Sequence, residues 1–315
     1  MNNLMKLVIL ICMFVIFSGC TEETAKPNNP THENPILMEH NGQQFEIYTF
    51  FEEYENFVDK AEKEPSNIEA LFNQEVKKAF AINSNHTVSL YEEIPAPKKL
   101  EQIREYLEKL KSNKQEINKW IHEALEESSD RLSGVDKTIY VFPSFVEEEA
   151  SLKDLDYVAG GTFGKEHFYL KINPSFTELA LKYTVAHEYH HTVAMESGDA
   201  TTLLERCILE GKADTFAKII YPQMEPVWQQ PLSGYYEEQG WKVFKENLES
   251  EESEESEIWD FLFVGNHFKG IAKWTNYKIG YEIMRSFLEK NHDVSTEEWT
   301  KMSAQEILAK SKYVD

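Results

Sequence analysis

A short run of residues near the middle of the chain could hold a metal ion and use it. His187, Glu188 and His191 form the pattern H-E-x-x-H. On a helix, residues four apart share one face, so the imidazoles of His187 and His191 would converge on one point. Two neutral imidazoles suit Zn²⁺, which takes nitrogen, sulfur or carboxylate ligands in a tetrahedral geometry. Glu188 would then be placed to take a proton from a water molecule and pass it to a leaving group.

The pentapeptide alone does not decide which histidine is the second metal ligand. Short patterns of this kind also arise by chance in chains rich in Glu and His. His190 competes with His191, because residues 187 and 190 also lie on neighbouring turns of a helix. We prefer His191, since the four-residue spacing leaves Glu188 correctly aimed. For His190 we expect the more common role of a satisfied or surface histidine.

A third ligand is expected from a second helix, over 203–220. A catalytic zinc site needs three protein ligands and one open position. Glu210 lies 19 residues after His191, which allows a turn and an antiparallel helix to return a carboxylate to the metal. Gly211 beside it would let the two helices approach closely.

Asp214 is expected to support the site without binding the metal. It lies four residues after Glu210 and therefore on the same helix face. A ligating histidine donates its other ring nitrogen to an oxygen acceptor, and Asp214 suits this role for His187. The alternative is that both acids lie on a solvated face. Cys207 is expected to be a small buried residue and not a fourth ligand.

The combined pattern resembles known zinc enzymes. H-E-x-x-H followed by E-x-x-x-D is similar to the gluzincin group of zinc peptidases, to which thermolysin belongs. His-Glu-Tyr-His-His with Glu-Gly-x-Ala-Asp resembles more closely the YjaZ-like family of predicted bacterial zinc-dependent proteases, from about Tyr140 to the C-terminus and including 277–281. Lys212 departs from the apolar residue usual in relatives. The resemblance implies one Zn²⁺ per chain and an α+β, zincin-like fold, mostly helical, with a small sheet before the H-E-x-x-H helix.

The resemblance also implies a group that stabilises the oxyanion of the reaction. In gluzincins this group is a Tyr or His from the C-terminal part of the chain, and such a donor is needed besides the metal. Tyr277, Tyr281 and His267 are the candidates. We choose Tyr277 because it lies in the segment that resembles the family. Its alternative role is that of a buried aromatic core residue.

The elements that must position these residues begin with two strands. Residues 138–142 and 167–172 are rich in β-branched and aromatic side chains and end at prolines or just before one. Between them, Gly160, Gly161 and Gly164 indicate a bend or a close approach of the backbone. The resemblance to zinc peptidases, in which an edge strand at this place pairs with the substrate backbone, implies the same role for the second strand.

The helix that carries the histidines is expected to follow at once. Ser175 and Glu178 have the spacing of a capping box, so the helix should begin there and run towards Ala194. Ala180 and Thr184 fall on the same face as the histidine pair. Their small side chains would either leave room for substrate or pack in the core.

The start of the chain is predicted to be a processing signal. Lys6 precedes the apolar run 7–17, whose 11 residues are too few for a stable helix across a bilayer. Small residues before Cys20 resemble a bacterial lipoprotein signal, in which this cysteine is acylated, although Phe17 replaces the usual Leu. We therefore expect a signal peptide over 1–19 and a lipid-anchored, extracytoplasmic protein. An ordinary cleaved signal peptide or a short anchor is the alternative.

The remaining organisation follows from composition. Residues 20–40 are polar and contain several prolines, as in a flexible tether. Residues 41–135 have the pattern of an N-terminal helical region, and residues 136–315 are expected to form the zincin-like catalytic domain. Cys12 would be removed with the signal peptide, and Cys20 would carry the lipid. Cys207 would then be the one remaining cysteine, so we expect no disulfide framework in the mature chain.

The predicted function is hydrolysis. The net charge of −23 repels nucleic acid, so we expect a peptide or protein substrate, with the membrane reached only through the lipid. The resemblance favours a metalloendopeptidase that uses zinc-activated water, with Glu188 as general base. A cell-wall peptide amidase with the same site, or a lipoprotein that only binds metal or a partner, are alternatives. Intact Glu188 favours an enzyme, because a binding protein needs no base beside its ligands.

Overall fold

A five-stranded mixed sheet organises the part of the chain that the computed structural model describes, residues 34–84, 94, 96–145, 152–251 and 265–313. The strand order is β1-β2-β3-β5-β4. The pairs β2/β3 and β3/β5 are parallel, and the outer pairs β1/β2 and β5/β4 are antiparallel. The strands are β1 (Ile36–His40), β2 (Gln43–Thr49), β3 (Lys137–Pro143), β4 (Val158–Thr162) and β5 (His167–Ile172).

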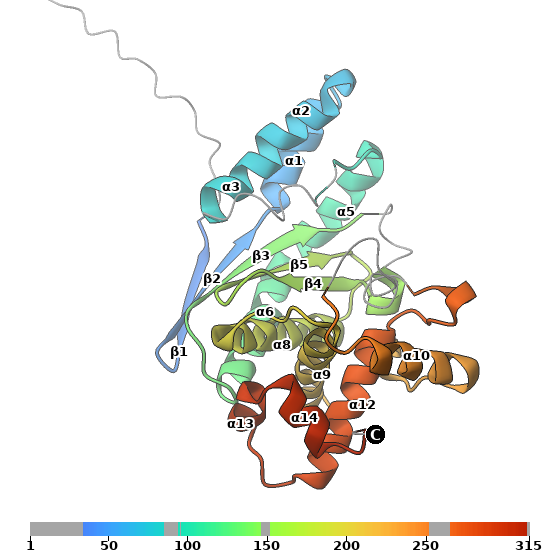
Figure 1. The fold of residues 1–315 in the computed structure, drawn as a ribbon. Helices are drawn as coiled ribbons and strands as arrows, with labels where there is room; N and C mark the ends of the chain where they lie inside the picture. The colour runs from blue at the N-terminus through green and yellow to red at the C-terminus, as the bar shows by residue number, and fades with distance from the viewer. Residues whose placement is uncertain (1–33, 85–93, 95, 146–151, 252–264, 314–315) are drawn as a thin grey trace, which may run out of the picture. The chain divides into compact units, whose positions relative to one another are not determined.

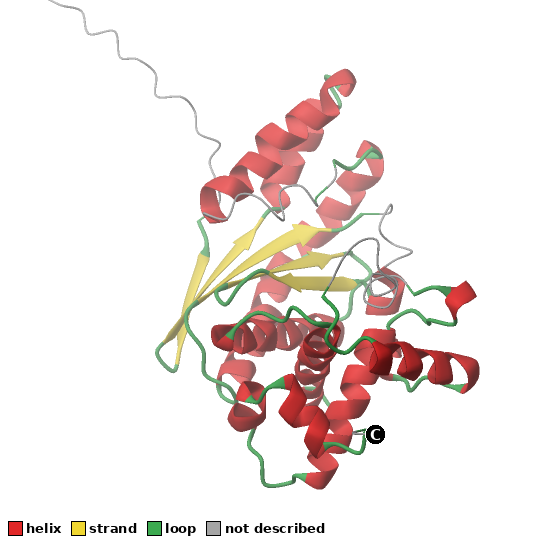
Figure 2. Cartoon of the chain, viewed as in Figure 1, coloured by secondary structure: helices red, strands yellow, loops and turns green. Residues whose placement is uncertain are grey.

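Helices make up most of the described residues (Figure 2). In the view of Figure 1, α1–α3 lie above the sheet and α8, α9 and α12 lie below it. The longer helices are α1 (Phe51–Ala61), α5 (Leu100–Ser112), α6 (Lys114–Ser129), α8 (Glu178–Ala194), α9 (Leu203–Ile220), α10 (Gly234–Glu246) and α12 (Thr275–Lys290). The shorter ones are α2 (Ile68–Phe72), a π-helical turn (Asn73–Lys77), α3 (Lys78–Ser84), α13 (Thr296–Lys301) and α14 (Ala304–Lys310). Single 3₁₀ turns are η1 (Pro65–Asn67), η3 (Lys153–Leu155), η4 (Met195–Ser197), η5 (Val227–Gln229) and η7 (His267–Lys269). The expectation of an α+β, mostly helical protein is confirmed.

Strand β3 forms the centre of the core. Four consecutive residues, 139–142, are fully buried, as expected for a strand covered on both faces. On one face, Tyr140 packs edge-to-face on Phe80 of α3 at 5.0 Å between ring centroids, and Phe142 stacks on Phe50 at 4.7 Å. The predicted strands 138–142 and 167–172 are confirmed as β3 and β5.

The N-terminal part of the fold corrects two expectations. Residues 41–135 are not helical throughout, because 43–49 form β2, which pairs in parallel with β3. The end of the expected tether, 36–40, forms β1. The sequence of β2 does contain a strand pattern, because apolar Phe45 and Ile47 alternate with polar residues. In the structure these two side chains are buried and their neighbours are more exposed, the two-residue period of a strand.

The edge of the sheet nearest the histidine helix is β4 and not β5. β5 pairs on both sides, so the expectation that it is an edge strand is wrong. β4 contains Gly160 and Gly161, residues that weaken a strand and so hid it in the sequence. A Cβ at Gly160 would lie 2.5 Å from the Glu188 side chain, so the expected close approach of the backbone is confirmed.

The N-cap of helix α8 lies two residues later than expected. It is Thr177, whose hydroxyl accepts a hydrogen bond from the backbone of Ala180. The expected capping box of Ser175 and Glu178 is therefore wrong, because Ser175 lies in the turn before the helix. Nearly all residues from 183 to 194 are buried, as in a helix covered on every side. Helix α9 has the predicted bounds and begins with a capping box from Thr202.

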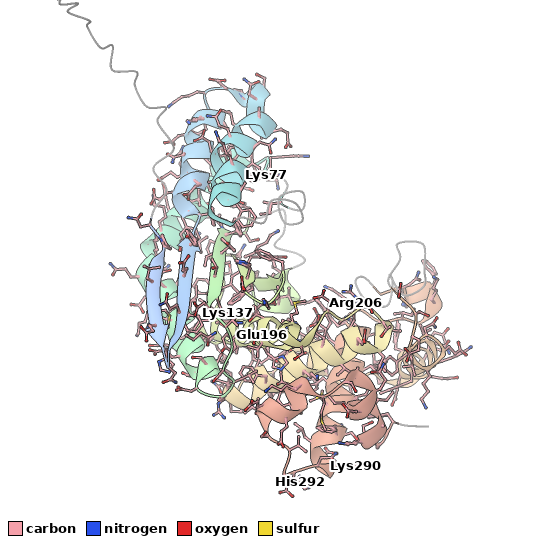
Figure 3. The ribbon with its side chains drawn as sticks, turned by 60° about the vertical axis from the view of Figure 1, so that its left-hand side comes forward. Lys77, Lys137, Glu196, Arg206, Lys290 and His292 are labelled. Atoms are coloured by element: carbon pink, nitrogen blue, oxygen red, sulfur yellow. The ribbon has the colours of Figure 1, made fainter. Side chains whose placement is uncertain are left out.

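An ion pair between a buried lysine and a partly exposed glutamate ties η4, directly after α8, to the start of β3. The fully buried Lys137 ammonium donates to Glu196 Oε1 at 2.9 Å and to the Lys165 carbonyl at 2.7 Å (Figure 3). Burial lowers the pKa of Lys137, and its two acceptors offset the cost of removing the charge from water. This contact fixes the C-terminal end of α8 against the sheet.

Among the residues placed by the structure, no helix combines the length and apolar character needed to cross a bilayer. The apolar run 7–17 and Cys20 lie outside the described residues.

Candidate metal centre

Three side chains from α8 and α9 converge on one point. The Nε2 atoms of His187 and His191 lie 2.9 Å apart, and each lies 3.2 Å from Glu210 Oε2. Within the described ranges, these residues form a cluster that could hold a metal ion. The structure thus brings together the three ligands that the sequence predicted, and both histidines present the same ring nitrogen.

The triangle has the size of a zinc site. Ligand atoms at about 2.0–2.1 Å from Zn²⁺ in a tetrahedron lie roughly 3.3 Å from one another. The three observed edges fall just below this length. Two nitrogens and one carboxylate oxygen are also the donor set that zinc accepts. The residues present therefore fit a zinc ion in number, in chemistry and in the spacing of their donor atoms.

The charges of the site favour a cation. Burial raises the pKa of Glu210, but the two imidazoles outweigh this effect and hold its pKa far below the usual range. Burial lowers the pKa of His187, but hydrogen bonds to Asp214 and Glu210 outweigh it and hold the pKa above the ordinary value. Three carboxylates, with Glu188, thus surround two imidazoles. Their excess of negative charge would be balanced by a divalent ion.

Asp214 lies behind His187, as predicted. Its Oδ1 atom lies 3.2 Å from His187 Nδ1 and accepts hydrogen bonds from the Tyr183 hydroxyl and the Trp228 indole, both at 2.9 Å. Because this carboxylate holds His187 Nδ1, the other ring nitrogen, Nε2, points to the place where the candidate ligand atoms converge. The sequence analysis missed Tyr183 and Trp228. Tyr183 could have been found, because it precedes His187 by four residues, whereas no spacing signals Trp228.

Glu188 is buried between α8 and the edge strand. Its Oε2 atom accepts a hydrogen bond from the Thr162 hydroxyl at 2.8 Å, and its side chain lies directly over Gly160. Burial raises the pKa of Glu188 above its ordinary value, although both imidazoles and the Thr162 hydroxyl act in the opposite direction. A raised pKa suits a carboxylate that must both take and return a proton. Thr162 also escaped the sequence analysis.

Tyr277 of α12 completes the wall of the site. Its ring stacks on that of His187 with centroids 6.4 Å apart and an interplanar angle of 22°. Burial raises the pKa of its hydroxyl, and Glu210 and Glu188 add to this effect. The hydroxyl therefore stays protonated and can donate a hydrogen bond.

The approach of α12 depends on two glycines. A Cβ at Gly280 would lie 1.8 Å from the Cys207 carbonyl oxygen, and one at Gly211 would lie 2.2 Å from the Gly280 oxygen. Gly211 therefore lets α9 approach α12, and the expectation that it serves the contact between α8 and α9 is wrong. The crossing places Tyr277 beside Glu210.

Two residues near the ligands point elsewhere. His190 Nε2 lies 3.1 Å from the Thr300 hydroxyl, and its ring stacks on Trp299 at 5.3 Å. Burial lowers its pKa well below the ordinary value. Lys212 donates to the carbonyls of Thr300 and Met302, at 2.9 and 2.7 Å. Both side chains thus contact the C-terminal part of the fold. The expectation of a satisfied histidine holds for His190 Nε2 only, because the buried Nδ1 has no hydrogen-bond partner among the described residues.

The other candidates lie outside this cluster. His267 is exposed and its Nδ1 atom contacts the Tyr236 hydroxyl. Neither it nor Tyr281 is among the described residues that line the pocket beside the histidines, whereas Tyr277 is. Cys207 is a free and fully buried thiol, as expected, and is not part of the ligand cluster.

One comparison with known proteins gives a family. A family described as "Predicted Zn-dependent protease (DUF2268)" matches residues 117–309, which include every side chain of the cluster. No curated protein and no solved structure matches the chain.

Proposed function

The chain belongs to the family of predicted Zn-dependent proteases DUF2268, and from this premise we propose that it is a zincin-like, gluzincin-type metalloendopeptidase. The observation that carries the proposal is the ligand triangle of His187, His191 and Glu210 with the buried carboxylate of Glu188 beside it. Because of the helical period, α8 presents two of the proposed ligands and the proposed base close together. Helix α9 presents the third proposed ligand, Glu210.

We propose that the triangle holds one zinc ion per chain. Bound there, zinc would supply Lewis acidity, polarising the substrate carbonyl and lowering the pKa of water. Asp214 keeps His187 oriented through Nδ1, and Tyr183 and Trp228 keep Asp214 oriented in turn. The protein thus fixes the ligand geometry before substrate arrives.

Proton transfer is assigned to Glu188. Its carboxylate would take the proton of the attacking water and deliver it to the amine nitrogen of the leaving group. The Thr162 hydroxyl occupies Oε2, which leaves Oε1 for this transfer. Tyr277 would donate its hydroxyl proton in a hydrogen bond to the oxyanion that forms on the carbonyl oxygen.

We propose that a peptide substrate pairs with β4. Among the described residues this strand pairs on one side only, with β5, and its other edge borders the metal cluster through Gly160 and Glu188. Extended peptides add to such edges through backbone hydrogen bonds. The absence of a side chain at Gly160 leaves Glu188 its place beside the strand.

The location is proposed from the first residues of the chain. Lys6, the short apolar run and Cys20 together support export and a lipid anchor on Cys20, with the site outside the cytoplasm. The net charge supports a tethered protein that does not otherwise adhere to anionic lipid.

The test compares wild type with Glu188→Gln. Both proteins should contain equal zinc, because Glu188 is not a ligand. Only wild type should cleave a mixed peptide library at internal bonds, with activity reduced in the variant by about 10²–10⁴-fold, the usual contribution of a general base. Equal cleavage by both would remove Glu188 from the mechanism. No cleavage by either, with zinc bound, would favour a metal-binding protein.

A further inference from the structure

A pocket opens beside the ligand triangle, on the same side as the proposed base. It has a cavity volume of about 70 Å³, and His187, Glu188 and Tyr277 form its inner side. Ala159 and Gly160 of β4 also line it. A peptide paired with β4 would therefore direct a side chain next to the bond under attack into this pocket.

Apolar side chains form part of the lining of the pocket, beside the polar groups of the site. Leu155 of η3, Val158 and Ala159 of β4, and Trp228 of η5 are among the residues that line it. Thr184 lies one turn before Glu188 on α8 and contributes a small side chain, whereas Ala180 is buried in the core. Among the described residues that line the pocket there is no Lys or Arg.

The walls are held in place by hydrogen bonds and an ion pair. The Trp228 indole and the Tyr183 hydroxyl, both lining residues, donate to the same oxygen of Asp214 at 2.9 Å. On the other wall, Asp154 next to Leu155 pairs with Lys273 at 2.8 Å, which ties η3 to the chain entering α12. Moving Trp228 aside for a larger group would break a buried hydrogen bond, whereas the ion pair on the Leu155 side is exposed.

The volume sets the size of the group that fits. An apolar cavity of about 150 Å³ admits benzene, with six carbons. The pocket has about half of that volume and so holds roughly three carbon atoms. An aromatic ring is too large. A carboxylate would lie against the Glu188 carboxylate, and an ammonium that paired with Glu188 Oε1 would block the proton transfer assigned to that oxygen.

We propose that this pocket is the specificity site of the enzyme and binds a small aliphatic side chain of the substrate, of the size of valine. The inference rests on the proposed function, since the substrate is taken to be a peptide. Leu155 and Trp228 neither bind the metal nor take part in proton transfer, and we assign them a role in substrate selection.

The first experiment separates binding from cleavage. A peptide series carries Gly, Ala, Val, Leu, Phe, Asp or Lys at one position, in an otherwise constant sequence taken from a wild-type library cleavage. If the library gives none, a poly-Ala frame replaces it. Wild type gives kcat/KM, and zinc-loaded Glu188→Gln gives Kd from the fluorescence change of Trp228 and its neighbours. We expect Val to exceed Phe, Asp and Lys by at least about 10-fold in both measurements.

The outcomes are distinct for the two proposals. Preferential binding of Val without any cleavage would leave the pocket in place and overturn the proposed hydrolysis. Cleavage with Phe or a charged residue equal to or better than Val would leave hydrolysis in place and overturn the pocket. Failure of both proteins to bind any peptide would also overturn the pocket.

Opposite substitutions at Leu155 test the wall itself. Leu155→Ala should enlarge the pocket and raise the Phe to Val ratio by about 10-fold, and Leu155→Phe should shift the preference to Ala and Gly. Ile219→Ala, at an exposed position of α9, is the matched control and should keep the wild-type order. Equal zinc content and melting temperature would show that the variants fold. Folded variants with the wild-type order would contradict the assignment.

Discussion

Helix α8 carries two of the proposed metal ligands and the adjacent carboxylate within five consecutive residues, whereas Glu210 and Tyr277 come from two other helices. The first group is placed by the period of one helix, which sets His187 and His191 on one face whatever surrounds them. The second group is placed by packing, since α9 and α12 must cross closely enough to bring Glu210 and Tyr277 to the same point.

The two groups therefore differ in what can disturb them. The contact between α9 and α12 passes through Gly211 and Gly280, where backbone atoms of one helix fill the space of a Cβ on the other. A substitution far from the candidate ligands can thus move Glu210 and Tyr277. The relative positions of His187, Glu188 and His191, the α8 group, are instead set by the helical period. The predictions that follow test this difference, beginning with the crossing.

The largest effect is expected for Gly280→Ala. The new Cβ would lie 1.8 Å from the Cys207 carbonyl oxygen, and backbone cannot yield as a side-chain tip can. Overpacking costs about 1–3 kcal/mol and more in rigid surroundings, against a gain of about 1 kcal/mol in helix propensity. We expect a net loss of about 2 kcal/mol in the free energy of unfolding, from denaturant titration, together with a lower zinc content.

The control is Gly240→Ala in α10. Its Cβ would meet the end of the Leu232 side chain at 3.0 Å, which can rotate away. This variant should be as stable as wild type or slightly more stable. Equal stability of the two alanine variants would show that the crossing of α9 and α12 does not limit the fold.

A smaller effect is expected where the α8 group depends on its surroundings. Tyr183→Phe removes one of the donors that orient Asp214 behind His187. Loss of such a contact weakens zinc affinity by about 10-fold, measured by competition with a chelating dye. Tyr236→Phe, whose hydroxyl contacts His267, serves as the control. Unchanged affinity in Tyr183→Phe would mean that the helix alone positions the ligand.

The smallest effect is expected at the edge strand. Thr162→Val removes the hydrogen bond to Glu188 Oε2 and keeps the shape of the side chain. The base would then sample other rotamers, and kcat should fall by several-fold, roughly 10-fold at most, with zinc content unchanged. A fall in zinc content, or no change in kcat, would show that Thr162 does not orient the base.

The sequence predicted the parts of the site that depend on helical spacing. The four-residue spacing on two expected helices was enough to predict the positions of five residues: His187, Glu188, His191, Glu210 and Asp214. Prediction failed where the cause lies in distant packing. β4 was hidden by glycines that serve a contact 28 residues away, Gly160 with Glu188, and the partner of Gly211 was α12.

The same limit applies to Trp228. It lies in a 3₁₀ turn with no periodic pattern, and its role follows only from the fold that brings its indole to Asp214 and its ring to the pocket. β1 and β2 were missed for a different reason. They precede a long helical region, and only the alternation around Phe45 and Ile47 distinguishes them from it.

The most direct test of the account is the zinc content of purified protein. Elemental analysis of wild type should give one zinc per chain, and Glu210→Ala should lose most of it, because two imidazoles alone leave the site short of a ligand. Glu225→Ala, at an exposed carboxylate paired with Lys218, should keep the wild-type content. A wild-type protein without zinc, or an unchanged content in Glu210→Ala, would contradict the metal site that α8 and α9 form together.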